Sequence, residues 1–180
     1  DNWFVGEVLL HMKRVLKRLD MTAKSFFALA DAGTCFVGSL YELTVAADRC
    51  YMLEEEGVVV GLTPLNFGAL PMGNGLTRIQ TRFLGDPSHA ARMLDHNGEV
   101  LDSDEAMEAG LVTDAFDDID WEDEIRLAIE ERASLSPDAL TGMEANLRFA
   151  GPESLETKIF GRLTAWQNWI FQRPNAVGPK

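Results

Sequence analysis

An apolar run that ends in a glycine turn and leads into a helix is the feature that most constrains this chain. Residues 25–30 (SFFALA) have the pattern of a buried strand. The connection that follows contains Gly33, and residues 38–48 (GSLYELTVAAD) predict a helix that carries Glu42 near its start. This order places free backbone N–H groups at the beginning of a helix, beside a carboxylate. Such a pairing is suited to chemistry next to a carbonyl group.

Strand and helix patterns alternate along the first part of the chain, and helices dominate the last part. Strand patterns at 49–53 and 58–62 follow the helix at 38–48, and a helical pattern with one apolar stripe precedes them all. We therefore expect an α/β fold with a helical C-terminal part. Residues 1–115 form the expected α/β core, and residues 116–180 form the expected helical region.

Local signals also predict where several elements begin and end. Ser103 is expected to cap a helix at 104–109, and residues 111–113 are expected to form a short strand. Ser136-Pro137 predicts the start of a helix, and Gly151-Pro152 predicts a break. The helix after that break is rich in aromatic side chains. Those side chains are either ordinary core or a packing face for another subunit or domain.

Composition excludes several classes of function. The formal net charge is −13, with 29 acidic and 16 basic residues, so binding to nucleic acid or to an anionic membrane is disfavoured. Cys35 and Cys50 are the only cysteines and cannot form a disulfide framework, so we expect a cytoplasmic protein. No apolar stretch is long enough for a membrane span, and no residue spacing suggests a metal site. The sequence begins at Asp1, and we expect it to be part of a longer polypeptide.

Three blocks of the sequence resemble the crotonase (enoyl-CoA hydratase/isomerase) superfamily. Residues 38–48 resemble its signature helix, in which small residues precede Glu-Leu and an Asp follows the Glu six residues later. Residues 68–78 (GALPMGNGLTR) resemble its Gly-x-x-Pro segment, and residues 101–112 resemble a block that ends in Ala-x-x-x-Gly-Leu-Val. The resemblance implies a ClpP/crotonase fold that is incomplete at its N-terminus.

The same resemblance implies roles for individual residues in binding an acyl-CoA thioester. Gly38 or Ser39 would give one backbone N–H to an oxyanion hole, and the second donor would come from a segment upstream. Glu42 matches the first of the two acid/base glutamates of the hydratases. Cys35 and Asn66 would lie at the substrate pocket, and Asp48 would be structural. Where the second glutamate is expected, this sequence has Pro64, and no carboxylate lies between Gly57 and Asp86.

Glu42 and Cys35 each have a second interpretation. A glutamate near the start of a helix stabilises that helix whatever its function, and Cys35 fits as a small packing residue. The chain is then either a catalytic half of its enzyme or a scaffold half that supports chemistry elsewhere.

Three further blocks, at 121–126, 136–153 and 160–171, resemble the C-terminal part of a branch whose members contain two crotonase-like halves. The resemblance implies an enzyme of aerobic benzoate degradation, which opens the ring of epoxidised benzoyl-CoA by adding water and releasing formate. It further implies an N-terminal half in the same polypeptide, a homo-oligomer, and no cofactor beyond the coenzyme A of the substrate. The alternative is a generic enoyl-CoA hydratase or isomerase.

Overall fold

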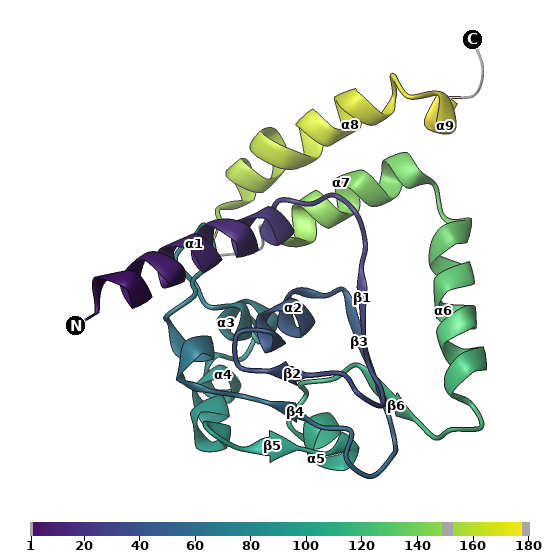
Figure 1. Ribbon diagram of the computed structural model, residues 1–180. Helices are drawn as coiled ribbons and strands as arrows, with labels where there is room; N and C mark the ends of the chain where they lie inside the picture. Colours follow the sequence, from purple (N-terminus) through teal and green to yellow (C-terminus); the bar gives the residue numbers. More distant parts are fainter. Residues whose placement is uncertain (1, 149–152, 178–180) are drawn as a thin grey trace. The chain divides into compact units, whose positions relative to one another are not determined.

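The computed structural model describes residues 2–148 and 153–177 (Figure 1). The chain divides into two compact units. The first unit contains Asp1–Asp20 and Phe26–Ile125, and the second contains Met21–Ser25 and Arg126–Lys180. The division therefore lies at Ile125, beyond the predicted boundary at 115, and the short segment after the first helix joins the second unit.

The first unit contains two three-stranded sheets. One is all parallel in the order β1-β3-β6, and in the other β2 is parallel and β5 antiparallel to the central strand β4. The strands are β1 (Phe27–Ala30), β2 (Phe36–Val37), β3 (Arg49–Leu53), β4 (Val60–Gly61), β5 (Val100–Leu101) and β6 (Asp114–Phe116). Parallel neighbours need a crossover between them, and the helices of this unit supply it. The predicted α/β class is confirmed.

Helices of the first unit connect the strands of the two sheets. They are α1 (Trp3–Asp20), α2 (Tyr41–Ala46), α3 (Arg78–Arg82), α4 (Pro87–Arg92) and α5 (Ser103–Glu108), with the 3-10 helices η1 (Pro64–Phe67) and η2 (Met93–His96). A single apolar core lies between them and the sheets, and it includes the fully buried Ala30, Met52, Val60 and Leu111. Helix α2 is tied into this core because the hydroxyl of Tyr41 donates a hydrogen bond to the carbonyl of Leu111 (3.0 Å).

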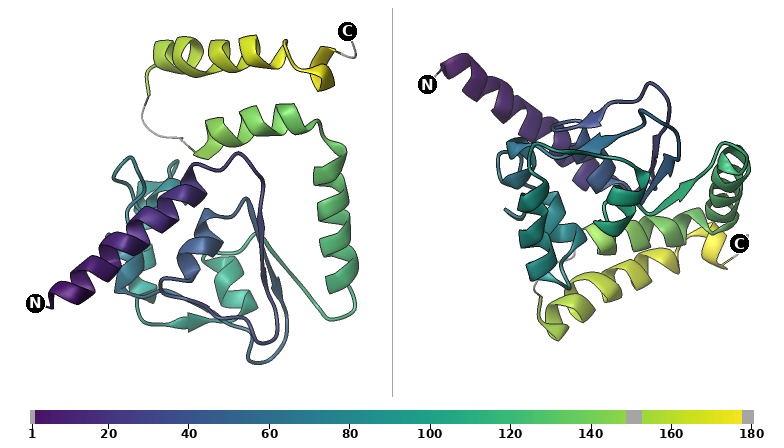
Figure 2. Two further views of the ribbon diagram at one scale, coloured as in Figure 1. Left: turned by 45° about the horizontal axis from the view of Figure 1, so that its top comes forward. Right: turned by 90° about the horizontal axis from the view of Figure 1, so that it is seen from below.

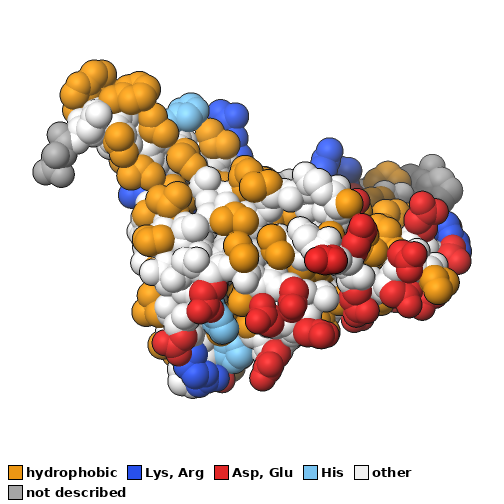
Figure 3. All heavy atoms as spheres, turned by 60° about the horizontal axis from the view of Figure 1, so that its bottom comes forward, with side chains coloured by type: hydrophobic (Ala, Val, Ile, Leu, Met, Phe, Trp, Pro, Cys, Tyr) orange, Lys and Arg blue, Asp and Glu red, His pale blue; other side chains and the backbone are white. Residues whose placement is uncertain are grey.

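Helix α1 packs against α2 (Figure 2). Most of the apolar side chains of α1 are exposed. Among its residues only Leu16 and Asp20 are buried. In Figure 3, exposed hydrophobic side chains gather on the end of α1 that projects at the upper left. Along α1 these are Trp3, Phe4, Val5, Val8, Leu10 and Val15. We refer to these six side chains as the α1 apolar face.

The second unit is helical. Helix α6 (Trp121–Ser134) begins in the first unit and continues here. It is followed by α7 (Pro137–Arg148), the π-helix η3 (Thr157–Leu163), α8 (Thr164–Ile170) and α9 (Pro174–Val177). The carboxylate of Glu144 accepts a hydrogen bond from the hydroxyl of Ser25 (2.5 Å) and is ion-paired with Arg132.

The aromatic side chains of the last helices are only partly used in packing. Trp166 contacts Gly142 of α7, where an added Cβ would lie 3.5 Å from the indole ring, and Trp166 packs edge-on against Trp169. Phe160 and Phe171 are exposed. Ordinary core therefore accounts for only part of this aromatic helix.

Most predicted elements are present, and two details differ. The last strand is β6 at Asp114–Phe116, not 111–113, because Leu111 and Val112 turn into the core before pairing with β3 begins. The cap of α5 is Asp102, whose carboxylate accepts from the N–H of Glu105 (3.0 Å), rather than Ser103. Helix α7 begins at Pro137, as Ser136-Pro137 predicted. The predicted break at Gly151-Pro152 lies outside the described residues.

The turn between β2 and α2 requires glycine at position 38. Gly38 has φ +58°, and a Cβ there would lie 3.0 Å from the hydroxyl oxygen of Thr63. We expect Gly38→Ala to lower the free energy of unfolding by about 2 to 4 kcal/mol, through left-handed strain and overpacking together. Gly33→Ala is the matched control, because Gly33 also has a positive φ (+84°) but open space around it, and it should lose only about 1 kcal/mol. Urea unfolding of both variants measures the difference, and equal losses would contradict the role given to Thr63.

Candidate functional site

The backbone between β2 and α2 forms a tight turn at residues 38–40. The N–H of Gly38 donates to the carbonyl of Gly61 on β4 (3.0 Å), and the N–H of Leu40 donates to the carbonyl of Val37 (3.2 Å). The next N–H, that of Tyr41, donates to the carbonyl of Gly38 (3.0 Å). These bonds leave the N–H of Ser39 between two amides that are already engaged.

Ser39 has the N–H that remains open at this turn. Within residues 2–148 and 153–177, its N–H makes no hydrogen bond to a protein acceptor, and the residue is half-buried. Gly38 or Ser39 was predicted to donate to an oxyanion. Because the N–H of Gly38 already donates to the carbonyl of Gly61, Ser39 is the remaining candidate for that predicted role. Helix α2 has only six residues, so the candidate donor is this one N–H and not a helix dipole.

Glu42 lies in a buried network of ion pairs. Its side chain is 2% exposed, and its two carboxylate oxygens accept from Asn66 Nδ2 and Arg78 Nη1, each at 2.7 Å. Burial raises the pKa of Glu42, and the hydrogen bonds from Asn66 and Arg78 lower it in part. The predicted acid/base carboxylate thus has protein partners on both oxygens, and its role in proton transfer stays a prediction.

Arg78 joins Glu42 to the end of α1. Its guanidinium group donates to both carboxylate oxygens of Asp20 (2.9 and 2.8 Å through Nη2) and also to the carbonyl of Leu70 (3.0 Å). Arg78 and Asp20 are 2% and 5% exposed. One buried arginine therefore balances two buried carboxylates from different helices. The sequence pattern did not reveal this pairing, since Asp20 only ends an amphipathic helix and Arg78 only closes a motif.

Asn66 also lies inside the protein. It is 1% exposed, and its Nδ2 donates to the carbonyl of Gly38 (2.9 Å) as well as to Glu42. Its Oδ1 accepts from the N–H of Thr63 (2.9 Å). With both amide hydrogens used, Asn66 has no donor left for a ligand. In this structure Asn66 is part of the buried network, and its predicted place at the substrate pocket stays a prediction.

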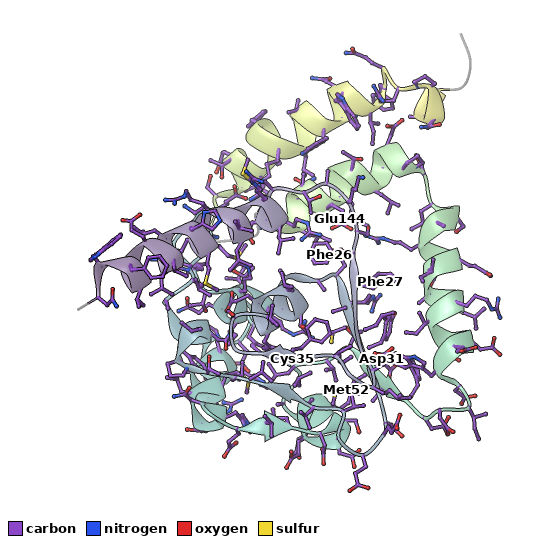
Figure 4. The ribbon with its side chains drawn as sticks, in the orientation of Figure 1. Phe26, Phe27, Asp31, Cys35, Met52 and Glu144 are labelled. Atoms are coloured by element: carbon purple, nitrogen blue, oxygen red, sulfur yellow. The ribbon has the colours of Figure 1, made fainter. Side chains whose placement is uncertain are left out.

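The other predicted residues are more simply placed. Cys35 is exposed on the connection that follows β1. Figure 4 labels it with the half-buried Asp31 of the same connection and with Met52 of the adjacent strand β3, neither of which was a predicted site residue. Asp48 is structural, because its carboxylate accepts from the N–H of Phe26 (2.7 Å) next to β1. Pro64 starts η1, where Thr63 is the cap.

An apolar groove of about 410 Å³ lies beside α3 and α4, and it was not foreseen from the sequence. Its lining includes Phe67, Ile79, Phe83 and Leu94. None of the five predicted site residues lines it. The groove could have been suspected only from the apolar spacing of two short helices.

The described residues hold no group of three or more His, Cys, Asp or Glu side chains that could bind a metal ion. Among the helices of the described ranges, none is both long and apolar enough to cross a membrane.

Comparison with solved structures shows which fold this is. The enoyl-CoA hydratase of Geobacillus kaustophilus superimposes with a TM-score of 0.74 at 23% sequence identity, over 98% of this chain and 64% of that one. The enoyl-CoA hydratase of Thermoplasma volcanium gives 0.73 at 20% identity, over 98% and 67%. The chain has the crotonase fold. The predicted fold is therefore confirmed, and the chain spans about two thirds of these crotonase-fold chains.

A curated relative is considerably more similar in sequence. The chain is 56% identical over 180 residues to benzoyl-CoA-dihydrodiol lyase of Aromatoleum evansii. This match covers 99% of the chain but 32% of that protein, so the chain spans about a third of the relative's length. No protein-family model matches the chain.

The buried network within this crotonase fold predicts a strong dependence on Arg78. We expect Arg78→Met to lower the free energy of unfolding by about 3 to 5 kcal/mol, because it leaves two uncompensated buried carboxylates. Adding Glu42→Gln removes one of those charges and should restore part of the loss. A double-mutant cycle by urea unfolding measures the coupling between the two side chains. Additive effects of the two substitutions would contradict the network.

The two cysteines are expected to differ sharply in reactivity. Burial raises the pKa of the Cys50 thiol to about 12, whereas Cys35 is exposed. The thiolate is the reactive form, so a maleimide at pH 8 should label Cys35 and leave Cys50 unmodified in the folded protein. Peptide mapping by mass spectrometry locates the label. In denaturant both should react, and labelling of Cys50 in the folded protein would contradict the placement of β3.

Proposed function

We propose that this chain is part of an enzyme like benzoyl-CoA-dihydrodiol lyase, acting on an aromatic acyl-CoA thioester. Two observations support the proposal: 56% identity along the whole chain to that lyase, and an open backbone N–H at Ser39 in a crotonase fold. In the proposed reaction the ring of epoxidised benzoyl-CoA is opened, with addition of water and release of formate. Coenzyme A enters only as part of the substrate.

The open N–H of Ser39 is the observation that carries the proposal, and in the proposed reaction it binds the thioester oxygen. As negative charge develops on that oxygen, a fixed N–H donor stabilises the transition state more than the ground state. One such donor contributes about 3 kcal/mol to lowering the barrier. We propose that the second donor comes from an N-terminal crotonase-like half of the same polypeptide.

We also propose that the groups that transfer protons in the reaction lie outside this chain. Both oxygens of Glu42 are engaged by Asn66 and Arg78, and Pro64 occupies the position where a hydratase would have its second glutamate. We therefore propose that Glu42 anchors the turn that carries Ser39. The chain then supplies an oxyanion donor, and proton transfer takes place on groups that the rest of the polypeptide brings.

The size of the side chain at position 39 tests this role. Ser39→Leu keeps the N–H but places a branched side chain where the thioester must approach it. We expect it to lower kcat by about 100- to 1,000-fold, the loss caused by removing one oxyanion donor. The measurement is release of formate from epoxidised benzoyl-CoA by the full-length protein.

Ser39→Ala is the matched control, because it keeps both the N–H and a small side chain. It should retain kcat close to that of the unmodified protein. Because Ser39 is half-buried, neither substitution should change the urea midpoint by much. Unchanged turnover by a folded Ser39→Leu variant would contradict the proposal.

A further inference from the structure

We propose that Asn66 is a positioning residue that holds the Ser39 N–H in the direction of the thioester oxygen. This inference rests on the function proposed above, and it assigns to Asn66 a role in catalysis without any contact to substrate. The group that Asn66 would hold is a single peptide, the one that joins Gly38 to Ser39.

The peptide between Gly38 and Ser39 is held from its carbonyl side. The carbonyl oxygen of Gly38 accepts two hydrogen bonds, from Asn66 Nδ2 (2.9 Å) and from the N–H of Tyr41 (3.0 Å). A trans peptide is planar, and its N–H points opposite to its C=O. Fixing the carbonyl of Gly38 toward Asn66 therefore fixes the N–H of Ser39 away from the buried network.

This peptide needs such a constraint because it follows a glycine. Gly38 has φ +58°, and glycine can adopt the mirror-image backbone conformations at little cost. A rotation of the peptide would turn the Ser39 N–H away from the ligand. It would also break the bonds from Asn66 and Tyr41 to the Gly38 carbonyl, which makes the observed orientation the favoured one.

The side chain of Asn66 is itself held in one orientation. Its Oδ1 accepts from the N–H of Thr63 (2.9 Å), and its Nδ2 donates to Gly38 and to Glu42 (2.7 Å). Exchanging the oxygen and nitrogen would place an acceptor against a carbonyl and a carboxylate, and a donor against an N–H. All hydrogen-bonding groups of this amide thus specify the same arrangement.

Glu42, in turn, is held by groups that belong to other elements. Arg78 Nη1 donates to Glu42 (2.7 Å), and Arg78 is bound bidentately by Asp20 at the end of α1. The four residues of this network are each at most 5% exposed: Asn66, Glu42, Arg78 and Asp20. The buried ion pairs therefore act as a rigid support for Asn66, and through it for the Ser39 N–H. Preorganisation of this kind is what gives an oxyanion donor its effect.

The polarisation of a bound thioester distinguishes positioning from simple structural support. Benzoyl-CoA with ¹³C at the thioester carbonyl serves as the probe, and difference infrared spectroscopy on the full-length protein reports hydrogen bonding to that carbonyl. In the unmodified protein the C=O stretch should lie at lower frequency than in buffer. In Asn66→Ala it should return most of the way to the buffer value. Turnover of epoxidised benzoyl-CoA should fall by about 10- to 100-fold in kcat with little change in KM.

Three variants make the readout specific. Asn74→Ala is the matched control, because Asn74 also accepts a local backbone hydrogen bond, from Leu76 (3.1 Å), but is exposed; its stretch and kcat should match the unmodified protein. Ser39→Leu should lose the shift. Asn66→Ser is the second substitution, used if Asn66→Ala does not give folded protein, and urea unfolding shows which variants are folded.

Each outcome has one meaning. If the unmodified protein itself shows no shift of the bound carbonyl, the proposed function fails. If the shift is present, and a folded Asn66 variant keeps both the shift and kcat, then only the positioning role of Asn66 is overturned. Loss of the shift in a folded Asn66 variant supports the inference.

Discussion

One guanidinium group, that of Arg78, holds together the part of this protein on which the site depends. It lies between the carboxylates of Asp20 and Glu42 and also binds the carbonyl of Leu70. Removing such charges from water is costly, and the cost is offset only when the partners are close and well oriented. The donor–acceptor distances around Arg78, 2.7 to 3.1 Å, meet that condition. The ends of α1 and α2, which are far apart in sequence, are fixed relative to each other by this group.

The same arrangement shows how a crotonase fold can hold its signature glutamate through protein partners on both carboxylate oxygens. In this chain Glu42 is buried and both of its oxygens accept hydrogen bonds, from Asn66 and Arg78. The nearby N–H of Ser39 has no protein acceptor among the described residues. Binding of an oxyanion and transfer of protons are separable tasks, because the first needs only a fixed dipole and the second needs a titratable group. We therefore favour a division of labour within a longer polypeptide, in which this chain contributes the dipole.

The sequence predicted the fold, but not the contacts around the residues that it proposed as a site. Motifs are read along the chain, so the order of strand, turn and helix around Gly38 could be found, and the strand 49–53 matches β3. Strands of two residues, such as β2, are too short to show a period. Asn66 and Arg78 were visible as motif neighbours. Their burial beside Glu42 follows only from tertiary packing, which brings together segments 24 and 36 residues apart.

The α1 apolar face has a practical consequence for anyone who produces this segment by itself. Six uncovered hydrophobic side chains, including Trp3 and Phe4, offer a surface that water wets poorly and that a second molecule can cover. Because hydrophobic attraction weakens on cooling, solutions of the isolated segment should stay clear longest in the cold and become turbid on warming.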